Sequence, residues 1–349
     1  MQTPQKIILI GLGKVGREAI QQLQASGLRF EITATADSTA CLIGQPLSAH
    51  QINTAIQTKA AGKKLSALQD AQPLPNLAAG FQPETLIVDC SASTDLDWSV
   101  AVQNGCQLVF ANKNSHSAPW TQAALMYNQP GIRYESTVGA SLPVIATLRS
   151  MLASGDQITR IEGVMSGTLG YLCSQLEAGA TYSQAVHQAF DAGYTEPDPR
   201  DDLSGFDALL LRKALIPART AGWHLEQTDF SVQPLYDDRL VGMPVAEFFQ
   251  RTALLDESYA QEVERATKEG RVLRYLVTIT PHGGSIGLQA VERSSALGAL
   301  QGPGNYFAFH SQCYDPIPLV IAGPGAGIVV TANGVLNDII ALTKSWKAD

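Results

Sequence analysis

The sequence predicts an α/β protein that begins with a doubly wound parallel sheet and continues into a second, α+β domain. The apolar run 6–10 is typical of a parallel strand that is buried on both faces. A glycine-rich turn over 11–16 follows at once, and apolar residues then recur at helical spacing up to about residue 25. A strand, a glycine turn and a helix in this order indicate a Rossmann-type nucleotide-binding domain.

The rest of the N-terminal part repeats the pattern of strand and helix. Further strands are expected at 31–36, 85–90 and 107–110. After Gly131, helical stretches alternate with shorter strands, of which 160–165 and 271–279 are the clearest. The change of pattern marks the start of another domain.

Three ranges follow from this organisation. We expect a dinucleotide-binding domain over 1–133, a second domain over 134–310, and a C-terminal segment over 311–349 that returns to the first domain. A second glycine-rich stretch, 322–327, lies in that last segment and precedes an apolar helical pattern.

Composition excludes several classes of function. The 349 residues carry a formal net charge of −8 without a basic cluster, so a nucleic-acid partner is not expected. The 5 cysteines are scattered and never spaced Cys-x-x-Cys, which indicates neither a disulfide framework nor a zinc site and fits a reducing cytoplasm. No apolar run approaches the roughly 18 residues of a membrane span. We expect a cytoplasmic protein without a membrane partner.

The turn Gly11-Leu12-Gly13-Lys14-Val15-Gly16 contains three glycines with different tasks. The first permits the tight turn, the second lets the backbone approach a pyrophosphate, and the third lets the helix pack on the strand. The helix N-terminus adds free N–H groups and a partial positive charge. All six residues are therefore candidate cofactor-binding residues.

Asp37 ends the second expected strand, 21 residues beyond Gly16. A carboxylate there accepts hydrogen bonds from the adenosine ribose and repels the 2′-phosphate of NADP, which favours NAD. Lys14 and Arg17 flank the glycine turn and could hold that phosphate, so NADP stays open.

Ser91 and Ala92 follow the expected strand 85–90. The carboxyl ends of the strands face the cofactor in this fold, so both residues are expected beside the nicotinamide ribose. A plain strand-end turn of small residues is the competing interpretation.

The segment 195–205 places four carboxylates and two prolines within eleven residues. Prolines stiffen the backbone and deny the segment a helix, so the carboxylates are held in fixed directions. A rigid acidic group suits recognition of an ammonium group, with a metal site as the competing use.

Several runs, taken in order along the chain, carry a family resemblance. Besides the glycine turn they are Ala111-Asn112-Lys113, Glu135-Ser136-Thr137-Val138-Gly139-Ala140-Ser141-Leu142-Pro143, Ser166-Gly167-Thr168, Gly193-Tyr194-Thr195-Glu196-Pro197-Asp198-Pro199-Arg200-Asp201-Asp202, Pro316-Ile317-Pro318-Leu319-Val320 and Gly325-Ala326-Gly327. The chain thereby resembles homoserine dehydrogenases over almost its whole length. It looks most like the dehydrogenase half of the bifunctional aspartokinase enzymes, without the kinase and without a C-terminal regulatory domain.

The resemblance implies an activity and an assembly. The family interconverts L-homoserine and L-aspartate 4-semialdehyde in threonine and methionine biosynthesis, by hydride transfer with NAD or NADP. Its second domain binds the substrate and forms the dimer interface. We therefore expect an NAD(P)-dependent homoserine dehydrogenase that forms a homodimer.

The resemblance also implies roles for single residues. Lys113 matches a lysine near the nicotinamide and the reacting carbon, and Glu196, Asp202 and Asp207 fall in the substrate-binding set. A monovalent cation such as Na⁺ is expected to bind largely through backbone oxygens of Glu135, Val138, Ala140 and Leu142. Ser141 replaces the family's usual glycine in that loop.

The proton-transferring lysine departs from the family spacing. Relatives carry it four residues after the aspartate, whereas Lys213 stands six residues after Asp207. At about 100° per residue, four residues separate side chains by roughly 40° and six by roughly 120°. In one alignment, an irregular helix start absorbs two extra residues and Lys213 is the general base. In the other, Leu211 takes the lysine's place and Lys113 is the only base.

Three functions therefore stay open. In a homoserine dehydrogenase, Lys113 near Lys213 would depress its pKa by like-charge repulsion and so favour proton transfer. A catalytically impaired homologue would bind nucleotide and act as a sensor or partner protein. A dehydrogenase for a related amino-acid semialdehyde would act on that substrate and not on homoserine.

Overall fold

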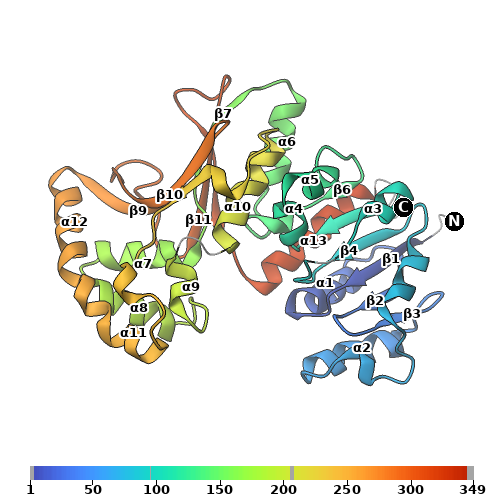
Figure 1. The fold of residues 1–349 in the computed structure, drawn as a ribbon. Helices are drawn as coiled ribbons and strands as arrows, with labels where there is room; N and C mark the ends of the chain where they lie inside the picture. The colour runs from blue at the N-terminus through green and yellow to red at the C-terminus, as the bar shows by residue number, and fades with distance from the viewer. Residues whose placement is uncertain (1–3, 95, 205–207, 344–349) are drawn as a thin grey trace. The chain divides into compact units, whose positions relative to one another are not determined.

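The computed structural model describes residues 4–94, 96–204 and 208–343, and the chain forms two compact units (Figure 1). The first unit comprises 1–145 and 326–349, and the second comprises 146–325. The chain leaves the first unit after Ile145 and returns to it after Gly325, later than the expected boundaries at 133 and 310. None of the described helices has both the length and the apolar composition that crossing a membrane requires.

In the described part of the first unit, a six-stranded sheet has the order β3-β2-β1-β4-β5-β6. Its strands are β1 (Gln5–Ile10), β2 (Phe30–Ala36), β3 (Cys41–Ile43), β4 (Leu86–Asp89), β5 (Gln107–Phe110) and β6 (Ile132–Arg133). Neighbouring strands are parallel except β2 and β3. The chain order reverses between β1 and β4, which is where such a sheet binds its ligand. The predicted doubly wound sheet is confirmed.

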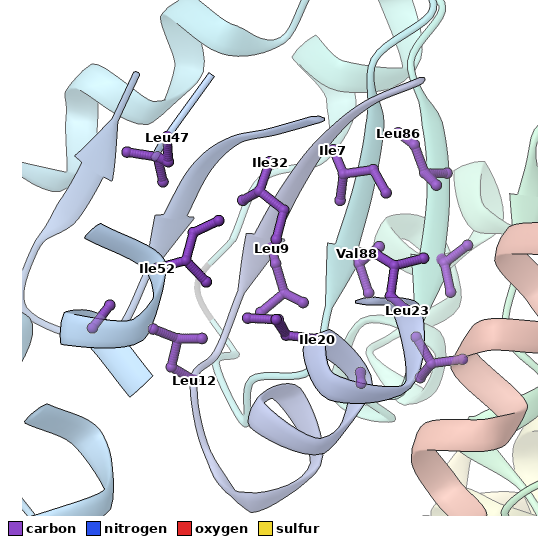
Figure 2. Packing of buried hydrophobic residues seen from close by; sticks show 14 of the residues in the cluster. Ile7, Leu9, Leu12, Ile20, Leu23, Ile32, Leu47, Ile52, Leu86 and Val88 are labelled. Carbon is purple, nitrogen blue, oxygen red and sulfur yellow. The ribbon is translucent and has the colours of Figure 1, made fainter. Parts of the chain in front are cut away.

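Helices cover this sheet because its strands are apolar on both faces. Ile20 of α1 (Lys14–Ala25) lies beside Leu9 of β1 in the close view of the core (Figure 2). Near the other end of the chain, α13 (Ile328–Leu342) buries Val335 in the same core, so the last described helix completes the first unit. The remaining helices that begin in this unit are α2 (Ala49–Ala60), α3 (Ser99–Gln103), α4 (Asn114–Ser117), α5 (Trp120–Ala123) and α6 (Val144–Ala153).

The second unit contains a mixed sheet in the order β12-β11-β7-β9-β10-β8. Its strands are β7 (Ile158–Val164), β8 (Phe230–Val232), β9 (Arg271–Thr280), β10 (Gly283–Glu292), β11 (Gly304–Ser311) and β12 (Leu319–Pro324). Its helices are α7 (Gly167–Glu177), α8 (Tyr182–Asp191), α9 (Pro199–Leu203), α10 (Ala208–Thr220), α11 (Val245–Arg251) and α12 (Asp256–Lys268). Both α7 and α12 contact β9, the long inner strand. The second unit is therefore the predicted α+β domain.

The acidic segment contains a short helix, α9, although its two prolines were expected to prevent one. Pro199 occupies the first turn of α9, where the missing N–H would have no partner in any case. Asp198 precedes it as the cap and accepts a hydrogen bond from the Arg200 N–H at 3.0 Å. The expectation that prolines deny this segment a helix was wrong, because a proline at a helix start promotes the helix.

Candidate functional site

The glycine turn after β1 has the geometry that its spacing predicts. Gly11 has a φ of 91°, and a Cβ added there would collide with the backbone of Cys90 and Ser91. A Cβ on Gly16 would collide with the carbonyl oxygen of Gly11. Gly13 has open space around it and is the N-cap of α1 without a side-chain cap. The first N–H groups of α1 are thus available to an anion.

A cavity of about 900 Å³ opens beside this turn, a size within the usual range for cofactor sites. The predicted cofactor residues in its wall are Gly11, Leu12, Gly13, Asp37, Ser91 and Ala92. The wall also contains residues that were not predicted, among them Lys59, Leu74, Leu77 and Leu96. The described lining does not include Lys14, Val15, Gly16 or Lys113. The cavity lies at the switch point of the sheet, and its donors and apolar walls fit a dinucleotide.

The carboxylate of Asp37 is already bonded within the chain. Its Oδ1 accepts hydrogen bonds from the Thr39 N–H at 2.8 Å, the Thr39 hydroxyl at 2.7 Å and the Ala40 N–H at 3.2 Å. Its Oδ2 accepts hydrogen bonds from Lys59 Nζ at 2.7 Å and the Leu65 N–H at 2.9 Å. Burial alone would raise the pKa of Asp37, but Lys59 and the other donors hold it well below its usual range. Little capacity remains for ribose hydroxyls, which weakens the argument for NAD.

Ser91, Ala92 and Lys113 lie at the carboxyl ends of two paired strands. Ser91 and Ala92 follow β4 and form part of the cavity wall, whereas Lys113 follows β5 and is the N-cap of α4. Because β4 and β5 pair in parallel, with Asp89 opposite Phe110, both ends lie at the same edge of the sheet. The structure thus brings the predicted nicotinamide-side residues to one edge.

In the second unit, two carboxylates of the acidic segment accept hydrogen bonds from the backbone of the segment itself. Asp202 accepts hydrogen bonds from the Glu196 N–H at 2.8 Å and from the Thr168 hydroxyl at 3.3 Å. Asp198 pairs with Arg200 at 2.7 Å, and hydrogen bonds from Arg200 lower the pKa of Asp198. The side chain of Glu196 is exposed. Glu196 is therefore better placed than Asp202 to meet a ligand.

Lys213 reaches the same region from α10. Its Nζ donates a hydrogen bond to the carbonyl oxygen of Met165 at 2.9 Å, directly before the predicted Ser-Gly-Thr motif. Leu211 is 5% exposed and lies two residues earlier, about 200° around the helix. Asp207 lies outside the described residues. Lys213 therefore reaches the start of the Ser166-Gly167-Thr168 run, from a different side of α10 than Leu211.

Relatives of known sequence identify the family of this chain. The family described as Homoserine dehydrogenase matches residues 143–340. The homoserine dehydrogenase of Emericella nidulans is 33% identical over 366 residues, which cover 97% of this chain and 98% of that protein. The chain belongs to the homoserine dehydrogenase family. The chloroplastic bifunctional aspartokinase/homoserine dehydrogenase 1 of Zea mays is 37% identical over 360 residues, and the match covers 96% of this chain but 38% of that protein.

Solved structures share the fold of this family member. A Candida auris protein of unknown function has a TM-score of 0.85 at 29% identity, with 99% of both chains covered. A hyperthermophilic archaeal homoserine dehydrogenase in complex with NADPH has a TM-score of 0.72 at 22% identity, again with 99% of both chains covered. At 22% identity, the second likeness shows the fold alone.

The loop in which the family resemblance places a cation lies between β6 and α6. Gly139 and Ala140 have φ values of 75° and 58°, and Ala140 is one of few non-glycine residues described in the left-handed region. Ser141 is not among the described residues with positive φ, so the backbone does not require the family's usual glycine there. The carbonyl oxygen of Leu142 accepts a hydrogen bond from the Val144 N–H at 2.7 Å.

Glu135 anchors this loop through both its side chain and its backbone. Its Oε1 accepts a hydrogen bond from the Ile145 N–H at 2.7 Å, and its own N–H donates to Asp338 Oδ2 at 2.8 Å. Its carbonyl oxygen accepts a hydrogen bond from the Val138 N–H at 3.2 Å. No group of three or more His, Cys, Asp or Glu side chains in the described chain could hold a metal ion.

The sequence did not indicate three polar residues of the first unit: Lys59 on α2, Asp89 at the end of β4 and Asn112 after β5. Lys59 lies in the last turn of α2, which begins at the capping box formed by Ser48 and Gln51. That box is a readable helix signal, and it would have placed Lys59 on a defined helix. The side-chain roles of Asp89 and Asn112 depend on contacts between different strands, which no local pattern contains.

Proposed function

We propose that this chain catalyses the reversible, nicotinamide-dependent interconversion of L-homoserine and L-aspartate 4-semialdehyde. The observation that carries the proposal is the position of Lys213, whose Nζ lies 2.9 Å from Met165 O despite its altered spacing from Asp207. A member of this family that keeps the lysine beside its substrate motif keeps the group that proton transfer requires. The Rossmann-type cavity of the first unit supports the cofactor half of the proposal.

In this mechanism Lys213 is the general base. The neutral amine takes the proton of the homoserine hydroxyl, while hydride leaves the carbon atom that carries this hydroxyl. In the reverse direction the ammonium returns the proton to the carbonyl oxygen as hydride adds to the carbonyl carbon. The bound nicotinamide supplies the hydride acceptor in one direction and the hydride donor in the other. Glu196 binds the ammonium group of the substrate through its exposed carboxylate. Lys113 and Ser91 belong to the nicotinamide side.

The geometry around Asp37 supports use of NADP as well as NAD. The negative charge of Asp37 is paired with Lys59 at 2.7 Å, so the carboxylate repels a 2′-phosphate less than an unpaired one would. The Lys59 side chain is 20% exposed and lines the cavity. We propose that Lys59 is the cation that binds the 2′-phosphate of NADP. The preference for NAD that Asp37 alone predicts is therefore not part of the proposal.

The family resemblance adds a cation and an assembly to the proposal. A monovalent cation such as Na⁺ would bind the backbone oxygens of the loop that contains Glu135, Val138, Ala140 and Leu142. A homodimer would form through the second unit. The molar mass in solution and the dependence of turnover on NaCl against choline chloride test these two points.

A single assay decides the main proposal. Purified protein is mixed with L-homoserine and either NAD or NADP, and the absorbance at 340 nm is followed. We expect a rise that requires homoserine, and addition of L-aspartate 4-semialdehyde with the reduced cofactor should reverse it. The absence of a rise with both cofactors, from protein that binds either of them, would show an impaired homologue. A rise with another amino alcohol but not with homoserine would show a related dehydrogenase.

A further inference from the structure

Two strand-end turns of the first unit are joined by one buried pair, Asp89 and Asn112. Asp89 is the last residue of β4 and has 0% exposure, and Asn112 stands two residues after β5 with 3% exposure. The carboxamide nitrogen of Asn112 donates hydrogen bonds to Asp89 Oδ2 at 2.9 Å and to the carbonyl oxygen of Ser93 at 2.9 Å. Asp89 Oδ1 accepts the N–H of Ser91 at 2.8 Å. The pair therefore holds the turn that follows β4.

The same pair also holds the turn that contains Lys113. Asn112 Oδ1 accepts the N–H of Asn114 at 3.0 Å, and Asn114 Nδ2 donates to the carbonyl oxygen of Ala92 at 2.8 Å. Lys113 thus lies between two asparagines, both of whose side chains are bonded toward the 91–93 turn. That turn is part of the cavity wall. A movement of either turn would be transmitted to the other.

Burial makes this arrangement costly for a purely architectural purpose. Burial raises the pKa of Asp89, and the hydrogen bonds from Ser91 and Asn112 oppose that rise. Burying a carboxyl that only neutral donors hold is unfavourable, whereas an apolar residue ends a strand without desolvating a charge. The position of Asp89 between the cavity wall and Lys113 suggests a functional reason for this desolvation.

We propose that Asp89 and Asn112 are positioning residues, which fix Lys113 relative to the 91–93 wall of the cofactor cavity. The inference rests on the proposed function, because it takes Lys113 to lie on the nicotinamide side. Neither residue needs to touch the reacting atoms. Both act by setting the distance between two strand-end turns, and small misplacements of reacting groups lower turnover steeply.

The test compares Asn112→Ala with a matched control, Asn104→Ala. Asn104 also donates its carboxamide to a backbone oxygen at 2.7 Å, but it lies before β5 begins, and its acceptor is Phe81 and not the 91–93 turn. We expect Asn112→Ala to lower kcat by about tenfold or more while the Kd of NADPH, measured by its fluorescence, changes by less than about threefold. Asn104→Ala should change neither quantity by more than about twofold.

Hydrogen exchange provides a readout that does not depend on turnover. In Asn112→Ala the amide of Asn114 loses its acceptor and should exchange faster. The amide of Ser91 should also exchange faster, because its acceptor Asp89 loses the hydrogen bond from Asn112 that holds the carboxylate. Normal kcat in the folded variant, or a loss of kcat no larger than the loss of NADPH binding, would overturn the proposal. If Asn112→Ala does not fold, Asn114→Ala removes the hydrogen bonds to the carbonyl oxygens of Ala92 and Ser93, leaves the Asn112–Asp89 pair in place, and should lower kcat by a smaller factor in the same way.

Failure of the proposed function gives a different result. Wild-type protein would then show no turnover with homoserine, whereas binding of NADPH and amide exchange would still report on the two turns. Faster exchange at Ser91 and Asn114 with unchanged NADPH affinity would leave the joining of the turns supported. Unchanged exchange would contradict it.

Discussion

Asp37 and Glu196, two carboxylates that the sequence marks as ligand-binding, occupy opposite environments. Asp37 is 9% exposed, and its two oxygens accept hydrogen bonds from Thr39, Ala40, Lys59 and Leu65. Glu196 is exposed, and in its segment Asp202 makes the bonds that hold the backbone. A motif therefore locates an acidic residue, but donors from elsewhere in the chain decide whether it serves the fold or a ligand.

The largest effect is expected at Lys213, which belongs to the same unit as Glu196. Lys213→Ala should lower kcat by about 100-fold or more, because it removes the proposed proton-transferring group, while NADPH binding stays within about twofold. Steady-state kinetics and fluorescence titration measure the two quantities. Lys268→Ala, which removes an exposed lysine paired with Glu264, is the control. If Lys213→Ala keeps a turnover near the wild-type value, Lys213 is not the general base, and the alignment that puts Leu211 in the place of the lysine is favoured.

Asp37→Asn should act on stability. The substitution removes the charge that pairs with Lys59 and turns an amide donor toward other donors, which we expect to cost about 2 kcal/mol of unfolding free energy at pH 7. The pKa of Asp37 is depressed in the folded chain, so its contribution is present above the unfolded value of about 3.9 and is lost as the pH falls below it. Urea unfolding of wild type and variant at pH 7 and at lower pH measures the difference. Asp70→Asn, at an exposed site, should show no such difference.

Glu196→Gln should act on the substrate and leave stability unchanged. We expect the KM for homoserine to rise by about tenfold, because the substitution removes one partly screened charge pair with the ammonium group of the substrate. The value of kcat should change less. Asp201→Asn, an exposed carboxylate five residues later, is the matched control. A rise in KM of the same size in both variants would indicate a general effect of negative charge and would remove Glu196 from the proposed site.

The smallest effect concerns the cofactor. Lys59→Ala should weaken binding of NADP by about fivefold and that of NAD by less than about twofold, as expected for a partly exposed ion pair. Fluorescence titration with NADPH and NADH measures both. Lys63→Ala removes an exposed lysine three residues after the end of α2 and should leave the ratio of affinities unchanged. Equal losses for both cofactors would show that Lys59 supports the fold of the cavity instead.

Local patterns predicted the first unit well because its motif is made of backbone constraints. Gly11 needs a positive φ and Gly16 needs the absence of a Cβ, and both requirements are visible in the sequence. The partners of Asp37 and Asn112 were not predictable in the same way, since Lys59 and Asp89 are 22 and 23 residues away from them. The helix at Pro199 was readable in principle, because Asp198 before a proline is a helix-start signal.

The open surroundings of Gly13 make it a site for a separation-of-function allele. It has φ −68° and ψ −167°, values that alanine adopts without strain, and an added Cβ would meet no described protein atom within 4 Å. The extra methyl group would instead occupy space beside the cofactor cavity. Gly13→Ala should therefore leave the chain folded yet unable to hold a pyrophosphate, and genetic complementation with that allele would separate the presence of the protein from the chemistry it performs.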